Sequence, residues 1–213
     1  MGQARPRTAV MYRYNASGVP TGMYVWLLDY SSGGCTASPV PEFEDLLTYH
    51  GFSIRITGVS GIRFKTGISP ATRAQLTGDG LAGYRLTEYG TLVMTAANQE
   101  FYPFVKDGQK VASGRAYWTE NGTVQDKVFE TAGGRYRFTS VLVNLPVSQY
   151  KTEFAFRGYI QLQKDGEQIT LYGPPVARSI YTVAQQILQI GEFAPGSSAD
   201  LFIRRLISDA DSL

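Results

Sequence analysis

The chain contains a single cysteine, Cys35, and a single histidine, His50. One cysteine excludes an intrachain disulfide and a zinc site built from several cysteines. The glycine pairs at 33–34 and 133–134 lack the lysine of a P-loop and the spacing of a dinucleotide fingerprint. No apolar run approaches the roughly 20 residues that a membrane-spanning helix needs. We therefore expect no cofactor, no metal site and no insertion into a membrane.

Charge is also scarce, at 18% of residues, and the net charge is only +2. Binding to nucleic acid usually requires a concentrated basic surface, so we expect no nucleic-acid partner. The first residues, Met1 to Arg5, have no apolar signal-peptide core. That leaves open both an intracellular chain and an exported chain without its leader. The 43% hydrophobic content is that of a globular protein with a substantial core.

What the chain does contain is a repeated turn signal. Asp107-Gly108, Asn121-Gly122 and Asp165-Gly166 each lie near runs of β-branched and aromatic residues. These dipeptides accept the positive φ angles of a two-residue type I′ turn, which joins antiparallel strands. The middle of the chain is thus predicted to be an antiparallel β domain.

Strand-like runs extend over most of the sequence. In Phe52–Thr57 and Gly61–Ile68, apolar residues alternate with polar ones at the two-residue period of a half-buried strand. Further strands are predicted at 8–14, 23–30, 84–89, 91–95, 112–119, 127–130, 136–145, 153–163 and 168–172. A short helix is predicted after Ser69-Pro70, and one or two helical turns over Glu42–Tyr49.

Towards its end the sequence changes from strand to helix patterning. Residues 177–190 place isoleucines on one helical stripe, and Ser197 or Ser198 can cap a second helix over 198–210. We predict an N-terminal β-hairpin (1–30), a linker rich in small residues and proline (31–41) and a main domain (42–213). The predicted fold is mainly β: an antiparallel β-sandwich, or strongly curved sheet, with one or two C-terminal helices packed on it.

Four phrases resemble a known module: Gly61-Ile-Arg-Phe-Lys-Thr66, Glu88-Tyr-Gly-Thr-Leu-Val93, Phe156-Arg-Gly-Tyr159 and Ala177-Arg-Ser-Ile-Tyr181. Together they are similar to a β-rich module of predicted secreted or surface proteins of gut Clostridia and their relatives. The resemblance covers about residues 52–190. It implies an extracellular or cell-surface setting and supplies no catalytic residues.

Several charged residues are embedded in apolar sequence, where a charge must be paired or must reach solvent. They are Glu88, Glu153, Arg63, Arg157 and Arg178. We expect at least one Glu–Arg ion pair among these five, connecting the sheet to the C-terminal helix. Ion pairing is favoured over catalysis for these carboxylates, because structural ion networks also perturb such groups.

No residue pattern predicts catalysis. Cys35 and His50 could form a thiolate–imidazole pair only if the fold brought them together. Glu42, Glu44 and Asp45 are explained by the start of the expected helix, where negative charge is favourable. Calcium is not indicated, because the acidic residues in turns lack the spacing of a calcium loop. We therefore assign no catalytic residue.

The remaining signal is a sheet face that mixes aromatic rings with arginines, able to stack sugars and to bond their hydroxyl or acidic groups. Tyr24, like Trp26, is an aromatic residue in a predicted strand with one solvent-exposed face. The candidate ligand-binding residues are Trp26, Tyr117, Trp118, Tyr136, Arg55 and Arg63.

Three functions remain open at this point. The first is a non-catalytic extracellular bacterial surface module that binds glycan or protein. The second is a structural spacer domain of a larger surface protein. The third is a hydrolase acting on polysaccharide or peptide, which requires a cleft with two carboxylates or Cys35 beside His50.

Overall fold

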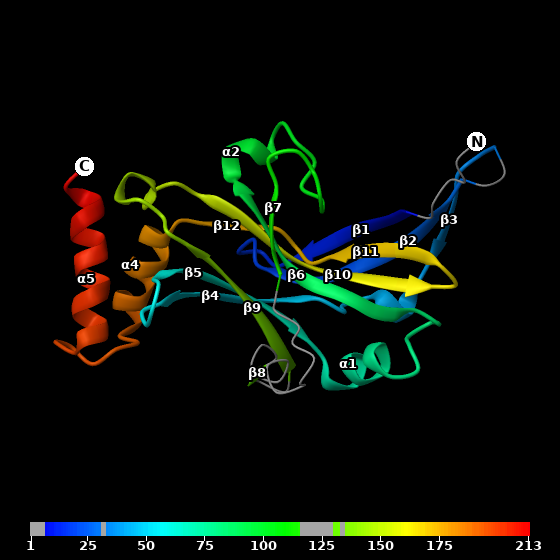
Figure 1. The fold of residues 1–213 in the computed structure, drawn as a ribbon, viewed down its shortest axis with the longest axis horizontal. Helices are drawn as coiled ribbons and strands as arrows, with labels where there is room; N and C mark the ends of the chain where they lie inside the picture. The colour runs from blue at the N-terminus through cyan, green and yellow to red at the C-terminus, as the bar shows by residue number, and fades with distance from the viewer. Residues whose placement is uncertain (1–6, 31–32, 116–129, 133–134) are drawn as a thin grey trace.

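The computed structural model describes residues 7–30, 33–115, 130–132 and 135–213. It is mainly β, with antiparallel sheets and two helices at the C-terminal end of the chain, as the sequence predicts. The molecule is elongated in Figure 1, with the N-terminal strands at one end and the C-terminal helices at the other.

The first sheet, which we call the N-terminal sheet, has the order β1-β2-β3. Its strands are β1 (Arg7–Tyr14), β2 (Pro20–Asp29) and β3 (Thr36–Pro39). The first two form the hairpin predicted for this region. β3 lies within the segment 31–41 predicted to be a linker, and it pairs with the end of β2. The division of the chain into domains stays a prediction.

The second sheet has the order β11-β10-β6-β7, with β12 also paired to β10. Its strands are β6 (Arg85–Thr95), β7 (Ala112–Arg115), β10 (Phe154–Lys164), β11 (Glu167–Tyr172) and β12 (Val176–Arg178). Asp165 and Gly166 join β10 to β11 with φ angles of 49° and 83°, so this turn prediction is confirmed.

The other two turn predictions fared differently. Asp107 also has a positive φ of 59°, but Asp107-Gly108 lies in the loop before β7 and joins no hairpin. Residues 103–108 turn locally, through Val105 N–H to Pro103 O and Gly108 N–H to Val105 O, and provide no preceding strand. Asn121-Gly122 lies outside the described residues.

The third sheet has the order β4-β5-β9-β8. Its strands are β4 (Thr48–Arg55), β5 (Gly61–Ile68), β8 (Glu130–Ala132) and β9 (Arg135–Val143). It packs against the β11-β10-β6-β7 sheet, and the rings of Phe64 from β5 and Phe156 from β10 stack with their centroids 5.8 Å apart. Side chains of these two sheets contribute to both large core clusters, one of which also contains residues of the N-terminal sheet and the other residues of α4 and α5.

Serine caps set where the helices begin. Ser69 caps α1 (Pro70–Thr77), and Ser197 caps α5 (Ser198–Asp211), both as predicted. α4 (Ile180–Ile190) begins three residues later than predicted, because Ser179 and Thr182 form a capping box while Ala177 pairs with β10. α2 (Ala96–Gln99) is a single turn.

The helix expected over residues 42–49 is reduced to a 3-10 turn at Pro41–Phe43. The reason is that β4 begins at Thr48 and that Asp45 takes a positive φ of 54°, which no helix continues. A second 3-10 turn, Val147–Gln149, follows β9.

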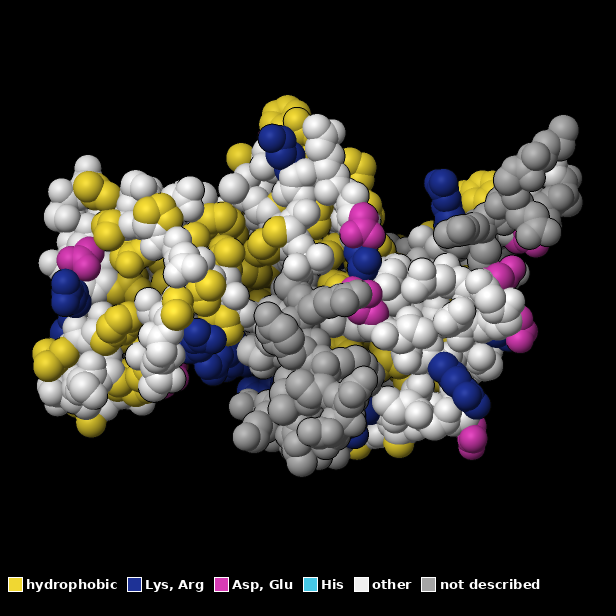
Figure 2. All heavy atoms as spheres, in the orientation of Figure 1, with side chains coloured by type: hydrophobic (Ala, Val, Ile, Leu, Met, Phe, Trp, Pro, Cys, Tyr) yellow, Lys and Arg dark blue, Asp and Glu magenta, His cyan; other side chains and the backbone are white. Residues whose placement is uncertain are grey.

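The helices α4 and α5 pack on one another and cover the end of the sandwich near β4 and β5. In the view of Figure 2, hydrophobic side chains gather at this end of the molecule. Ile190 and Leu201 are among its exposed apolar residues.

The N-terminal sheet is attached to the rest of the molecule along β1 and β11. These strands lie side by side without a ladder of backbone hydrogen bonds between them. Instead, two side chains of β1 donate to backbone oxygens of β11. The Thr8 hydroxyl donates to Thr170 O at 2.9 Å, and the Tyr12 hydroxyl to Tyr172 O at 3.3 Å.

Candidate functional site

The N-terminal sheet has two unlike faces, because successive side chains of a strand point to opposite sides. Its inner face is packed into the core, with Met23 and Val25 fully buried and Val10, Tyr12 and Leu27 packed around them. The strand register places a different set of residues on the opposite side, which we call the outer face. The outer face is formed by Arg7, Ala9, Met11, Arg13, Gly22, Tyr24, Trp26, Leu28, Ala37 and Pro39.

Two aromatic rings lie side by side on the outer face. Tyr24 and Trp26 are two residues apart on β2, and their ring centroids are 6.3 Å apart. Both are partly exposed. Trp26 lies between Ala9 of β1 and Pro39 of β3, whose short side chains leave the indole accessible from above the sheet. Met11, which is 56% exposed, lies opposite Tyr24 and extends this apolar surface.

Arg13 bounds the outer face at one end. Its guanidinium carbon lies 4.6 Å from the centroid of the Tyr24 ring, and Nη1 donates to the Tyr24 hydroxyl at 3.2 Å. Nη2 donates to Asp45 Oδ1 at 2.6 Å. Hydrogen bonding to Asp45 and then to Tyr24 raises the pKa of Arg13. The Arg13 charge is therefore balanced by a carboxylate.

Asp45 and Gly22 make this arrangement possible. Asp45 Oδ1 also accepts the backbone N–H of Met23 at 2.7 Å, so one carboxylate connects the residues after the 3-10 turn to β2. Gly22 lies opposite Arg13, and a Cβ atom there would lie 2.8 Å from Arg13 Nε. Only glycine leaves the guanidinium room to reach Asp45.

Arg157 of β10 contacts the inner side of β1. Its guanidinium joins β1 to the loop before β7 and to the segment after β11. Its Nε donates to Gly173 O at 3.2 Å, its Nη1 to Phe104 O at 2.7 Å and its Nη2 to the Tyr12 hydroxyl. The guanidinium carbon lies 4.4 Å from the ring centroid of Tyr172. We call Arg157 with these neighbours the Arg157 cluster.

Burial determines the electrostatics of this cluster. It lowers the pKa of Arg157, an effect that the nearby tyrosines Tyr12 and Tyr172 oppose. It also raises the pKa of Tyr12 and of Tyr14, which the Arg157 charge lowers in turn. The guanidinium stays charged at neutral pH, because arginine is not deprotonated in proteins.

A second polar network lies on the same face of the β11-β10-β6-β7 sheet. The Tyr159 hydroxyl donates to Glu88 Oε1 at 2.6 Å, and Lys106 Nζ lies 3.9 Å from the same oxygen. The Lys106 backbone N–H donates to the Tyr172 hydroxyl at 3.1 Å, which connects this network to the Arg157 cluster.

The structure separates most of the predicted ligand-binding residues. Trp26 lies on the outer face of the N-terminal sheet, whereas Arg55 and Arg63 lie on β4 and β5 of another sheet. Arg55 Nε donates to Val59 O at 2.6 Å. Tyr136 is in β9, opposite Ile68 in the register. Tyr117 and Trp118 lie outside the described residues.

The Glu–Arg ion pair expected among five charged residues stays a prediction, and the described contacts of these residues involve other groups. Glu88 interacts with Tyr159 and Lys106, and Arg157 binds backbone oxygens and Tyr12. Arg178 donates to the adjacent Ala177 O at 2.7 Å. Glu153 precedes β10, and its carbonyl accepts the Ala96 N–H. Arg63 lies opposite Ser53 on β4. Asp211 of α5 forms an ion pair with Lys151, with Nζ and Oδ1 2.9 Å apart.

The residues of the hydrolase alternative lie on separate elements. Cys35 is exposed just before β3, where it interacts with Tyr30, whereas His50 is in β4 against Gly67. Among the described residues, no three His, Cys, Asp or Glu side chains come together in a group that could hold a metal ion. No described helix is long and apolar enough to cross a membrane.

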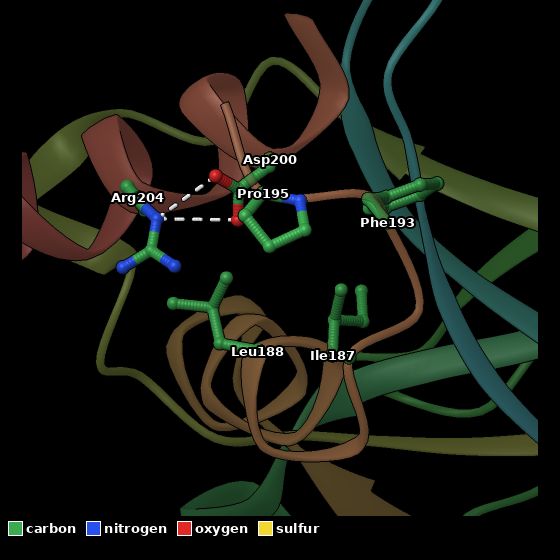
Figure 3. Close-up of a pocket in the computed structure, with 7 residues that line it drawn as sticks. Ile187, Leu188, Phe193, Pro195, Asp200 and Arg204 are labelled. Atoms are coloured by element: carbon green, nitrogen blue, oxygen red, sulfur yellow. Dashed lines mark hydrogen bonds and ion pairs between the residues drawn. The ribbon is translucent and has the colours of Figure 1, made fainter. Parts of the chain in front are cut away.

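A small pocket lies between the end of α4 and the start of α5, with a volume of about 60 Å³. Figure 3 shows Asp200 and Arg204 at its mouth, above Ile187 and Leu188. Ligand sites usually have about 300–1,000 Å³, so this pocket has room only for water. Asp200 is a buried residue of the first turn of α5, where its carboxylate accepts the Gly196 N–H at 2.9 Å and the Arg204 Nε–H at 3.0 Å. The Arg204 hydrogen bond, followed by that of Gly196, lowers its pKa.

No protein-family model, no curated protein and no solved structure matches the chain. The two candidate sites are therefore defined by the geometry of this molecule alone. They are the outer face with Tyr24 and Trp26, and the Arg157 cluster.

Proposed function

We propose that the protein is a non-catalytic binding module that takes a glycan on the outer face of its N-terminal sheet. One observation carries the proposal: Tyr24 and Trp26 lie 6.3 Å apart on the solvent side of a sheet whose other side is core. Neither ring is among the buried residues of the core, although large aromatic side chains usually gain most stability there. Exposed apolar surface of this kind marks interaction sites.

The chemistry of the outer face suits a sugar. The CH groups of a pyranose ring pack on aromatic faces, and its hydroxyls need hydrogen-bond partners at the edge of the contact. Tyr24 and Trp26 supply the rings, and the phenol, the indole N–H and the Arg13 guanidinium supply polar groups around them. Asp45 balances the charge of Arg13 at one end of the face, and the exposed Arg7 lies opposite Leu28 towards the other end.

The resemblance of residues 52–190 to a module of secreted and surface proteins adds support for an extracellular or cell-surface setting. In that setting the glycan would belong to a bacterial or host surface. A protein ligand and a spacer role without any ligand are the competing interpretations of the same face.

A glycan array with matched variants tests the proposal. The purified chain is screened together with Trp26→Ala, Tyr24→Ala and the control Phe101→Ala, which removes a ring that is 76% exposed on another part of the molecule. We expect Trp26→Ala to weaken saccharide binding about ten-fold or more, because an aromatic anchor contributes over about 1 kcal/mol to an interface. Phe101→Ala should bind normally.

A blank array, or equal losses in Phe101→Ala and Trp26→Ala, would refute the glycan proposal. Since Trp26 lies outside the buried core, its removal leaves the fold in place, and circular dichroism of each variant verifies this.

A further inference from the structure

Four basic residues share the side of the third sheet that faces away from the core. Phe64 of β5 packs in the core, so Arg63 and Lys65 next to it point to the opposite side. The strand register adds Arg55 of β4 and Arg137 of β9 to that side. All four residues are partly exposed. We call them the basic row.

The basic row runs diagonally across three strands. Arg63 and Lys65 are two residues apart on β5. Arg55 lies diagonally across from Arg63 on one neighbouring strand, and Arg137 diagonally across from Lys65 on the other. Positions related in these two ways have their Cβ atoms about 7 Å apart. The row is therefore a continuous line of basic positions along the face of the sheet.

The three strands of the basic row contain no acidic residue. Neither Asp nor Glu occurs in β4, β5 or β9, and Glu130 of β8 lies opposite Arg137 at one end of the row. Within the described part of the chain, Arg63 has no carboxylate partner and Arg55 donates to a backbone oxygen. Lys65 and Arg137 also take part in other contacts. Like charges within reach of one another across strands destabilise a sheet, so the row does not serve the stability of the fold.

A buried hydroxyl on the same side of the sheet has no hydrogen-bond partner among the described residues. It belongs to Ser53 of β4, which lies opposite Arg63 and is 9% exposed. Buried hydroxyls usually have a partner in the protein or in ordered water. A ligand hydroxyl, or a water held between a ligand and the sheet, can supply this partner.

We propose that the basic row binds a linear acidic polysaccharide that lies across β4, β5 and β9. A line of charges along a sheet face suits a polymer with repeated sulfate or carboxylate groups, because each side chain meets a separate anionic group. Arginine binds such oxyanions through pairs of N–H donors. The sugar hydroxyls between the anionic groups suit the polar neighbours of the row, Ser53 and Thr139.

The chemistry of this face favours a polysaccharide over other polyanions. Single-stranded nucleic acid is typically held by aromatic rings on which its bases stack. The register of the described strands places no aromatic residue of β4, β5 or β9 on this side. An acidic peptide that binds a sheet commonly adds a strand at an edge. The basic row instead crosses the face, with its two central residues on β5 between β4 and β9.

The test is isothermal titration calorimetry of the full chain with a heparin oligosaccharide of defined length, at low and at physiological ionic strength. We expect saturable binding that weakens about five-fold or more as the salt concentration rises, because salt screens exposed charges. The same titration with polygalacturonate, which carries carboxylates in place of sulfates, determines which anionic group the row prefers. Absence of binding to both polymers would overturn the proposal.

Matched variants locate the site. Arg63→Gln and Arg55→Gln should each weaken heparin binding about five-fold, the effect of removing one exposed ion pair. The control Arg85→Gln removes the same charge from an exposed position on β6 and should bind as wild type. Arg63→Gln should leave the thermal midpoint unchanged or raise it, because it relieves repulsion within the row. A lowered midpoint would assign Arg63 a structural role instead.

Equal weakening by Arg85→Gln and Arg63→Gln would overturn the proposal, because binding would then depend on net charge alone. So would tighter binding of single-stranded DNA or polyglutamate of the same charge, which would assign the row to another class of polyanion. Trp26→Ala should bind heparin as wild type, since Trp26 lies on another sheet. Loss of heparin binding in Trp26→Ala but not in Arg63→Gln would place the acidic polymer on the outer face and refute the basic row.

Discussion

The two faces of the N-terminal sheet come from the same three strands and meet opposite environments. Met23 on the inner face is completely buried, whereas Met11 on the outer face is 56% exposed. Both faces are nonetheless rich in apolar and aromatic side chains. An antiparallel sheet with one wet face normally shows polar residues there.

The difference shows that the apolar residues of the outer face do not serve to hold the sheet in place. The inner face does that, through burial of Met23 and Val25, the Tyr12–Arg157 contact and the β1–β11 hydrogen bonds. The outer face is therefore available for a task other than stability. Mutations on the two faces should separate these roles.

The largest effect is expected from truncating the inner methionine. Met23→Ala should lower the free energy of unfolding by about 3 kcal/mol, because it leaves a cavity in the core. The matched change Met11→Ala on the outer face should alter it by less than about 0.5 kcal/mol. Urea denaturation of the two variants measures both values. Equal losses would contradict the distinction between the faces.

A smaller effect is expected for the tyrosines of neighbouring strands. Tyr12→Phe removes the hydroxyl that accepts a hydrogen bond from Arg157 and donates one to Tyr172 O. It should lower the free energy of unfolding by about 2 kcal/mol, because one of the lost bonds involves a charged group. Tyr24→Phe on the outer face should cost less than about 1 kcal/mol, because Arg13 keeps its bonds to Asp45. Urea denaturation at pH 7 measures the free energy of unfolding of both variants. A larger decrease in Tyr24→Phe than in Tyr12→Phe would contradict the view that the inner face holds the sheet in place.

A third effect is confined to alkaline pH. Tyr89, in the core that the inner face joins, has its pKa raised by burial to about 12. Its neutral form stabilises the fold fully below the ordinary tyrosine pKa of about 10, and this contribution is lost as the pH rises from about 10 to about 12. The free energy of unfolding should fall over that range in wild type and fall less in Tyr89→Phe. Parallel curves for the two proteins would exclude Tyr89 as the cause.

Local patterns predicted the elements well. The alternation of Gly61–Ile68 defines β5 with the same bounds, Asp165-Gly166 makes its hairpin, and the serines at 69 and 197 cap their helices. Each of these features depends on residues within a few positions of one another. The mainly antiparallel fold with C-terminal helices follows from them.

The candidate sites were harder to predict, because they depend on contacts between distant residues. Trp26 and Tyr24 were recognised as aromatics of a strand with one wet face, but their association with Arg13 needed the β1–β2 register. Arg157 was one of five residues among which an ion pair was expected, and its hydrogen bond to Tyr12, 145 residues away, was not foreseen. Asp45 was assigned to a helix start and instead binds Arg13, 32 residues earlier. No signal in the sequence specifies these partners.

The side-chain hydrogen bonds between β1 and β11 have a consequence for self-association. An edge strand with free backbone groups is a template on which another chain can add a strand. Here the carbonyl oxygens of Thr170 and Tyr172 already accept the hydroxyls of Thr8 and Tyr12. A second molecule that approaches this edge meets occupied acceptors and the side chains of β1, so β11 is protected from intermolecular sheet growth.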